Sequence, residues 1–298
     1  MFDTVATLDC AGRVLRLDRP RVMGIVNVTP DSFADGGQHA TLEAAIAHGL
    51  RLVEEGADLL DVGGESTRPG AEPVDEATER ARVLPVIEAL AARTSVPISV
   101  DTSKPGVMRA ALAAGAGMVN DVRALRAEGA LEALAGSKAA VVLMHMAGEP
   151  RTMQQAPAYD DVVGDVHRFL AERVFACEIA GIDKRRLVID PGFGFGKSLA
   201  HNLALLSQLG RFVEIGVPVL AGLSRKSSLG QITGRDVGDR VAASVAAHLI
   251  AVQNGAMLVR VHDVAATVDA LKVWTSVSAL AAPRGKTAPP AIRWPDDE

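Results

Sequence analysis

The chain has only two cysteines, no excess of positive charge and no sign of an export signal. Lysine and arginine total 31 against 36 aspartate and glutamate residues, so a surface that binds nucleic acid is not expected. Cys10 and Cys177 form neither a metal-binding spacing nor a disulfide framework, which favours a reducing compartment. Asp3 and Asp9 stand where a secretory signal would need basic residues. These absences predict a cytoplasmic protein.

Long hydrophobic runs are also missing. Each apolar run is far shorter than the roughly 20 residues needed to cross a membrane, so no membrane partner is expected. Nevertheless, 48% of the 298 residues are apolar, which is enough for a large core. A chain of this length lies within the range of a single α/β barrel.

What the sequence does contain is a repeated alternation of short, β-branched apolar runs with alanine-rich segments of helical period. The runs expected to be strands lie at 22–28, 58–63, 97–101, 117–121, 139–145, 186–190, 217–222 and 256–261. Helices are expected between them, and a last helix over about 263–276. The strand runs are continuously apolar, which is typical of parallel strands buried on both faces.

Uninterrupted strand–helix units predict an α/β fold, the closed (β/α)8 or TIM barrel. An open doubly wound sheet remains the alternative, because the number of strands does not prove closure. The first twenty residues are expected to form a β-hairpin that turns at Ala11-Gly12 and covers the bottom of the barrel. We predict one domain over 1–276 and a disordered tail over 277–298, which is rich in alanine and proline.

The segment IDPGFGFGK, residues 189–197, ends an expected strand and has three glycines at alternate positions. It does not match the phosphate loop of nucleotide hydrolases, because Pro191 stands where that motif needs glycine. The dinucleotide motif G-x-G-x-x-G fails as well, since Lys197 occupies its last glycine position. We interpret the segment as a turn that brings bare backbone close to a ligand other than a nucleotide.

Polar side chains stand at the end of every expected strand, where the active sites of TIM barrels lie. They are Asn27, Asp61 with Glu65, Asp101, Asn120 with Asp121, His145, Asp190, Ser224-Arg225-Lys226, and Arg260 with His262. One such residue would more often be a helix cap, but a complete ring is harder to explain by capping. Buried acceptors beside cations suggest a flat heterocycle with several N–H donors and a phosphate-type group.

Segments along the whole chain resemble, in the same order, the motifs of the dihydropteroate synthase family. They are MGIVNVTPDSFADGG (23–37), DVGGESTRPGAEPV (61–74), SVDTSKP (99–105), VNDV (119–122), LMHM (143–146), IDPGFGFGK (189–197), SRKS (224–227) and RVHDV (260–264). The resemblance implies a (β/α)8 fold, a Mg2+ requirement and the joining of 6-hydroxymethyl-7,8-dihydropterin diphosphate to 4-aminobenzoate. It also implies a homodimer, formed through helices late in the barrel, and a target of sulfonamides.

The resemblance assigns a role to residues in each part of the site. It implies that Asn27 binds Mg2+ and that the diphosphate is held by Thr67, Arg260 and His262. The pterin edge would be read by Asp101, Asn120 and Asp190, with a ring acceptor facing Lys226. The 4-aminobenzoate would contact Pro69, Phe195 and Ser224.

Two long loops, 29–39 and 66–74, are expected to act as mobile lids. Their charges suggest a pair between Asp35 and Arg68, so the residues nearest the chemistry would be Asp35, Arg68, Lys226 and Arg260. Outside this set, His145 is expected to pack at the barrel rim and His248 to lie on a helix surface. Lys197 is expected to be solvated at a helix start.

Two other kinds of protein remain open on these residues. A pterin barrel resembling the methyltetrahydrofolate-dependent corrinoid methyltransferases would share the pterin-reading residues but would not need SRKS and RVHDV as an anion site. A non-catalytic paralogue would have lost diphosphate or aminobenzoate groups, and none of the matched positions is lost. The set of motifs therefore favours the synthase.

Overall fold

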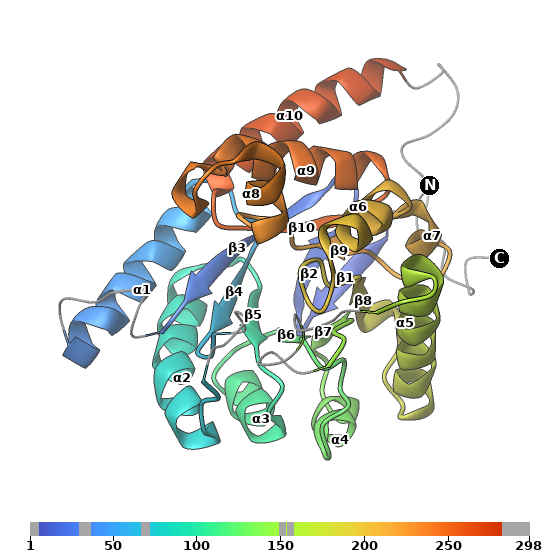
Figure 1. Ribbon diagram of the computed structural model, residues 1–298. Helices are drawn as coiled ribbons and strands as arrows, with labels where there is room; N and C mark the ends of the chain where they lie inside the picture. The colour runs from blue at the N-terminus through green and yellow to red at the C-terminus, as the bar shows by residue number, and fades with distance from the viewer. Residues whose placement is uncertain (1–5, 30–36, 67–71, 149–152, 154–157, 282–298) are drawn as a thin grey trace, which may run out of the picture.

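The computed structural model describes residues 6–29, 37–66, 72–148, 153 and 158–281, in which a ring of parallel strands is surrounded by helices (Figure 1). The strands are β3 (Arg21–Asn27), β4 (Leu59–Gly63), β5 (Ile98–Asp101), β6 (Met118–Asp121), β7 (Ala140–Met144), β8 (Leu187–Asp190), β9 (Leu220–Ala221) and β10 (Leu258–Val261). Their order is β8-β7-β6-β5-β4-β3-β10-β9. A bridge between Ile189 and Val219 joins the two outer strands, so the sheet is a TIM-type barrel, as predicted, and not an open sheet.

Strand β9 is the shortest of the ring and has two residues, although the sequence predicts a strand over 217–222. Pro218 has no N–H to contribute to a ladder, which shortens the regular pairing. Its carbonyl oxygen still accepts a hydrogen bond from the Ile189 amide at 2.9 Å. The segment therefore closes the barrel without being a full strand.

The helices cover the outside of the ring. They are α1 (Gly37–Glu54), α2 (Glu76–Arg93), α3 (Pro105–Ala113), α4 (Ala130–Ala135), α5 (Val162–Ile179), α6 (Leu199–Ser207), α7 (Gly210–Val213), α8 (Ser227–Thr233), α9 (Val241–Gln253) and α10 (Val264–Ala281). The prediction that the last helix ends near 276 was wrong, because α10 continues to Ala281. In the described part of the chain, no helix is long and apolar enough to cross a membrane.

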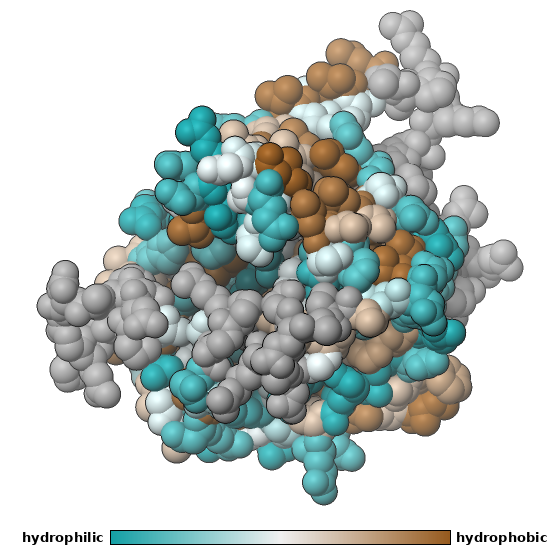
Figure 2. All heavy atoms as spheres, viewed as in Figure 1, coloured by the Kyte–Doolittle hydropathy of each residue, from teal (hydrophilic) through white to brown (hydrophobic). Residues whose placement is uncertain are grey.

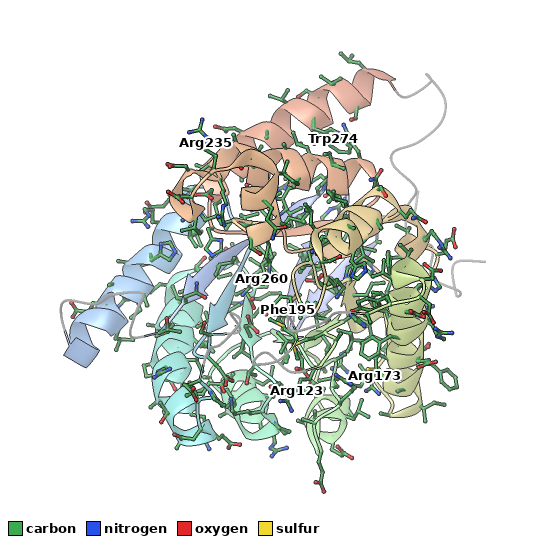
Figure 3. All side chains as sticks on the ribbon, viewed as in Figure 1. Arg123, Arg173, Phe195, Arg235, Arg260 and Trp274 are labelled. Carbon is green, nitrogen blue, oxygen red and sulfur yellow. The ribbon has the colours of Figure 1, made fainter. Side chains whose placement is uncertain are left out.

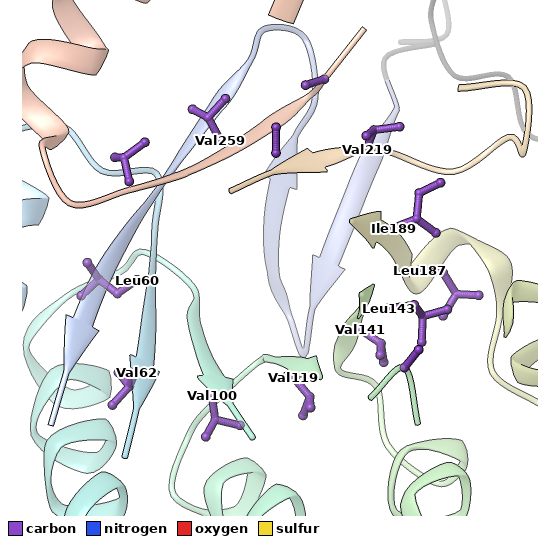
Figure 4. Packing of buried hydrophobic residues seen from close by; sticks show 14 of the residues in the cluster. Leu60, Val62, Val100, Val119, Val141, Leu143, Leu187, Ile189, Val219 and Val259 are labelled. Atoms are coloured by element: carbon purple, nitrogen blue, oxygen red, sulfur yellow. The ribbon is translucent and has the colours of Figure 1, made fainter. Parts of the chain in front are cut away.

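Each strand divides its side chains between two apolar layers. In β4, Leu60 and Val62 point outward and pack in the layer between strands and helices (Figure 4). Leu59 instead packs with Met23 and Met118 in a second cluster inside the barrel. Successive residues of a strand face opposite sides, so the residue two positions after each inward apolar residue also faces inward. Asp61 follows the inward-facing Leu59 in this way. By the same spacing, the inner polar residues Asn120, Asp190 and Arg260 follow inward apolar residues, which are Met118, Val188 and Leu258.

A hairpin closes the bottom of the barrel, as predicted. Strands β1 (Thr7–Cys10) and β2 (Arg13–Arg16) pair in antiparallel fashion. Leu8 and Leu15 are buried in the inner apolar cluster. The Arg13 guanidinium donates hydrogen bonds to the carbonyl oxygens of Thr94, at 3.1 Å, and Val96, at 2.7 Å. Both residues lie just before β5. With the N-terminal end of the strands covered, the site must lie at their C-terminal end.

Candidate functional site

Arg260 of β10 connects two strands inside the barrel mouth by binding an aspartate on each of them. Its Nε donates to Asp61 Oδ2 at 2.6 Å, and its Nη2 donates to Asp101 Oδ2 at 2.8 Å. Asp61 and Asp101 lie on the neighbouring strands β4 and β5. One guanidinium thus neutralises two largely buried carboxylates. Buried carboxylates need such a partner, because an unpaired charge in the interior is strongly destabilising. Burial raises the pKa of Asp101, and Arg260 opposes that rise.

Asp61 organises this cluster. The sequence identifies it only as a polar residue at a strand end and predicts no role for it. It is fully buried, and the same oxygen that binds Arg260 also accepts from Asn120 Nδ2 at 2.9 Å. This contact orients the Asn120 amide and, among the residues that the structure describes, leaves its carbonyl oxygen available as an acceptor. The signal that could have found Asp61 is its position, two residues after an inward-facing Leu59.

Asp190 ends β8 and is bonded to its own loop. Its Oδ1 accepts from the Gly192 amide at 2.7 Å. The following helix α6 is capped by Ser198, so Asp190 does not serve as a helix cap. Burial raises the pKa of Asp190 to about 6, against the Gly192 hydrogen bond and the positive charges of Lys226 and Lys197.

The glycines of residues 189–197 are needed because the loop presses against the segment after β7. Gly192 has φ of +72°, and a Cβ there would overlap the carbonyl oxygen of His145. Gly196 has φ of +65°, and its Cβ would lie 2.7 Å from the oxygen of Ala147. Both the turn and this backbone contact therefore exclude a side chain. Approach to a ligand, the reason expected from the sequence, stays a prediction.

Gly192→Ala is expected to be far more destabilising than Gly181→Ala. Gly181 also has a positive φ, +83°, but among the described residues nothing lies within 4 Å of its Cβ position. Its substitution should cost about 1–2 kcal/mol from the left-handed backbone alone. Gly192→Ala adds overlap with a main-chain oxygen and should cost more than about 4 kcal/mol. Urea unfolding of both variants measures the difference, and equal losses would contradict the packing argument.

Lys197 is buried beneath this loop, with only 3% of its surface exposed. Its Nζ donates to the Phe195 carbonyl oxygen at 3.0 Å and lies 2.9 Å from His145 Nδ1. The prediction of a solvated lysine was therefore wrong. Burial lowers the pKa of Lys197 to about 7, while burial and Lys197 together lower the pKa of His145 to about 3. His145 packs against Phe169, which confirms its predicted place in the rim.

Lys226 and Phe195 meet at the barrel mouth, on the segments that follow the adjacent strands β9 and β8. The Nζ of Lys226 lies 4.2 Å from the centre of the Phe195 ring, which is the geometry of a cation–π contact. Figure 3 shows Phe195 and Arg260 close to the centre of the barrel. Burial and the charge of Arg260 lower the pKa of Lys226 to about 8, so it remains mainly cationic at neutral pH.

Ser224 and His262 form a pair beside these cations. Ser224 Oγ accepts from the His262 amide at 3.1 Å and lies 2.9 Å from its Nδ1. Burial has the largest effect in lowering the pKa of His262 to about 3, and the positive charges of Arg260 and Arg225 lower it further. With this pKa the His262 imidazole is neutral at pH 7. If Nδ1 accepts from the serine hydroxyl, Nε2–H is left as a donor.

Asn27 is the last residue of β3, at the same end of the ring as these groups, and pairs in register with Gly63. Its amide oxygen is a hard ligand of the kind that Mg2+ accepts, and this ion commonly keeps waters and substrate phosphates as its other ligands. Among the described residues, no group of three or more His, Cys, Asp or Glu could hold a metal. The Asn27 amide oxygen would suit a Mg2+ that takes its other ligands from water and substrate. The predicted site residues Asp35, Thr67, Arg68 and Pro69 lie outside the described residues.

The mouth of this TIM barrel brings together Asp101, Asn120 and Asp190 with Arg260 and Lys226. The family described as "Pterin binding enzyme" matches residues 23–262 of this chain. Dihydropteroate synthase of Escherichia coli K12 is 51% identical over 262 residues, which are 88% of this chain and 93% of the relative. The chain belongs to the dihydropteroate synthase family and is a transferase of that kind.

Solved structures agree with this assignment. A Xanthomonas albilineans dihydropteroate synthase with 4-aminobenzoic acid is 69% identical, has a TM-score of 0.88, and the match covers 92% of this chain and 99% of that one. The same enzyme in complex with 7,8-dihydropteroate gives 66% identity and a TM-score of 0.84 over 92% and 99% of the two chains. A Yersinia pestis dihydropteroate synthase in complex with a sulfonamide drug is 49% identical and has a TM-score of 0.88, and the match covers 92% of this chain and 99% of that one.

Proposed function

We propose that the protein condenses 6-hydroxymethyl-7,8-dihydropterin diphosphate with 4-aminobenzoate to give 7,8-dihydropteroate and diphosphate. The observation that carries the proposal is the set of inward acceptors, Asp101, Asn120 and Asp190, with two cations at the same mouth. Support comes from the Xanthomonas albilineans relatives, which hold 4-aminobenzoic acid and 7,8-dihydropteroate. The Yersinia pestis relative supports the further proposal that sulfonamides bind this site.

The acceptors orient the pterin. Asp190 and Asp101, when ionised, accept from N–H groups of the ring, and the carbonyl oxygen of Asn120 accepts from another. Lys226 donates to a ring acceptor on the opposite side. Because these groups are held by bonds to their neighbours, the CH2 carbon that bears the diphosphate is presented in a fixed direction. Phe195 and Ser224 then bound the space for 4-aminobenzoate.

The chemical step replaces an oxygen by a nitrogen at this CH2 carbon. The C–O bond breaks and the diphosphate leaves with the electron pair, while the amine of 4-aminobenzoate forms the new N–C bond and loses a proton to solvent. Negative charge grows on the departing oxygen, so Arg260 and the N–H of His262, with Thr67, lower the barrier by binding that charge. No nucleophilic side chain is required. Mg2+ on the amide oxygen of Asn27 would supply further neutralisation of the diphosphate.

Diphosphate release tests the proposed function. Purified protein is incubated with dihydropterin diphosphate and Mg2+, with and without 4-aminobenzoate, and both products are measured. Release that needs every component, with an equal amount of dihydropteroate, supports the synthase. Binding of the pterin diphosphate in a calorimeter without any release would instead indicate a non-catalytic paralogue.

The pH profile of kcat/KM is expected to be bell-shaped, with an acid limb between about pH 6 and pH 7 and an alkaline limb near pH 8. Below about 7 Asp101 becomes protonated, below about 6 Asp190 follows, and neither can then accept from the pterin; above about 8 Lys226 loses its charge. The alkaline limb should fall about tenfold per pH unit, and the acid limb more steeply once both carboxyl groups are protonated. Lys226→Arg keeps the positive charge at high pH, so any activity it retains should lack the alkaline limb. A limb unchanged in that variant contradicts the assignment to Lys226.

We also propose a homodimer formed through the last helices. Apolar side chains are exposed on both helices, Ile250 on α9 and Val273, Val277 and Leu280 on α10. Figure 2 shows apolar residues along α10 at the top of the molecule. Burying such side chains against a second copy would remove them from water. Sedimentation velocity measures the state directly, and a monomer at micromolar concentration would contradict the dimer.

A further inference from the structure

The turn between β9 and α8, residues 223–226, has a backbone shape that needs outside support. Arg225 at its centre has φ of +57°, a region that residues with side chains rarely adopt. The two neighbours of Arg225 are Ser224, which contacts His262, and Lys226, which lies over Phe195. A change in the turn would therefore move two side chains of the site at once.

Helix α9 and its N-cap residue bind the backbone of this turn at three points. His248 Nε2 accepts from the Leu223 amide at 3.2 Å, and Ser244 Oγ accepts from the Arg225 amide at 2.9 Å. Arg240 Nη1 donates to the Arg225 carbonyl oxygen at 3.1 Å. Both backbone groups of the left-handed residue are thus bonded to α9.

Arg240, Ser244 and His248 are four residues apart and form one line on the helix, the α9 stripe. Ser244 and His248 are 2% and 1% exposed, so the prediction that His248 lies on a helix surface was wrong. The Ser244 hydroxyl donates to the Arg240 carbonyl oxygen at 2.7 Å, which leaves its lone pairs for the turn. Because His248 Nε2 is an acceptor, its neutral ring carries the proton on Nδ1.

The side chain of Arg225 anchors the turn on a second side. Its Nε and Nη2 donate to the two oxygens of Asp263 at 3.0 and 2.5 Å, a bidentate pair. Asp263 follows His262 directly, so this pair ties the turn to the loop after β10. The α9 stripe and Asp263 together hold the turn from two directions.

We propose that Arg240, Ser244 and His248 are positioning residues for the reaction, which act by holding the turn so that Ser224 and Lys226 face the barrel mouth. The proposal rests on the proposed function, in which these two side chains bind substrate. The stripe acts through backbone hydrogen bonds and needs no contact with substrate. Its effect should therefore appear as a loss of turnover in a protein that is still folded.

Kinetics of stripe variants test the proposal. Ser244→Ala removes the acceptor for the Arg225 amide and is expected to lower kcat/KM about tenfold, with Tm within about 3 °C of wild type. Ser207→Ala is the matched control. Among the described residues, the Ser207 hydroxyl bonds only the carbonyl oxygen of Ala204 in its own helix, at 3.0 Å, so this variant should leave kcat/KM unchanged. His248→Gln retains an acceptor and should keep more activity than His248→Leu. Equal activity in wild type and Ser244→Ala would overturn the proposal.

Amide hydrogen exchange without substrates separates this proposal from the proposed function. In Ser244→Ala the Arg225 amide should exchange about tenfold faster, while amides of β3 stay unchanged. If the wild type released no diphosphate, the proposed function would fail, and this exchange rate would still decide whether the stripe holds the turn. Unchanged exchange at Arg225 would overturn the positioning role.

Discussion

Lys226→Ala is expected to lower kcat/KM by about a hundred- to a thousandfold while the fold stays intact. The variant loses the cation that we propose faces the pterin, together with the contact with Phe195 at 4.2 Å. Among the described residues Lys226 makes no ion pair, so its removal leaves no carboxylate without a direct partner. Steady-state kinetics and thermal unfolding of the same preparation measure both effects.

Lys138→Ala is a suitable control for this experiment, because Lys138 is exposed at the opposite, N-terminal end of β7. It should leave kcat/KM and Tm unchanged. If Lys226→Ala had activity close to that of wild type, Lys226 would have no place in the site. A Tm lowered by more than about 10 °C would show that the lysine is structural instead.

Arg260→Ala is expected to abolish turnover, with kcat/KM about a thousandfold lower, and to weaken the fold as well. The sequence alone predicts an intact fold for this variant. The structure predicts otherwise, because Arg260 neutralises both Asp61 and Asp101. Removing one partner of a buried ion pair costs about 3–5 kcal/mol, which corresponds to a Tm lower by about 10 °C in a chain of this size.

The double variant Arg260→Ala/Asp61→Asn separates the two effects. Removing the charge of Asp61 should restore part of the lost stability, since one buried carboxylate no longer lacks a partner. Activity should remain lost, because the guanidinium that we propose binds the diphosphate is still absent. Wild-type stability in Arg260→Ala alone would contradict the shared role of the guanidinium, and near-wild-type activity would contradict its place in the site.

The barrel itself could be predicted from the sequence because its signals are local. Apolar runs with helical segments between them mark the strands, and all the expected strands are present in the expected order. The exceptions arise where local signals are weak. Pro218 shortens β9, and α10 runs past the expected end at 276 because alanine-rich residues continue the helix to Ala281.

The partners of the polar residues could not be predicted in the same way. Asp61 and Arg260 are 199 positions apart in the chain, and no local pattern joins them. Lys197 and His248 carry polar groups that are usually exposed, yet each is buried because acceptors or donors from other segments surround it. Sequence patterns describe what a residue is, whereas burial depends on which distant segments pack around it.

The sequence alone established the order of strands and helices, the polar residue at each strand end and the resemblance to a family. Closure of the strands into a barrel depends on the tertiary structure, through the bridge between Ile189 and Val219. Only the folded chain decided that Arg260 binds two carboxylates, that burial lowers the pKa of His262, and that α9 supports the turn at Arg225. The physical reason is that secondary structure follows from short-range periodicity and backbone preference. Charge state and hydrogen bonding follow from desolvation and from neighbours that only closure of the barrel brings together.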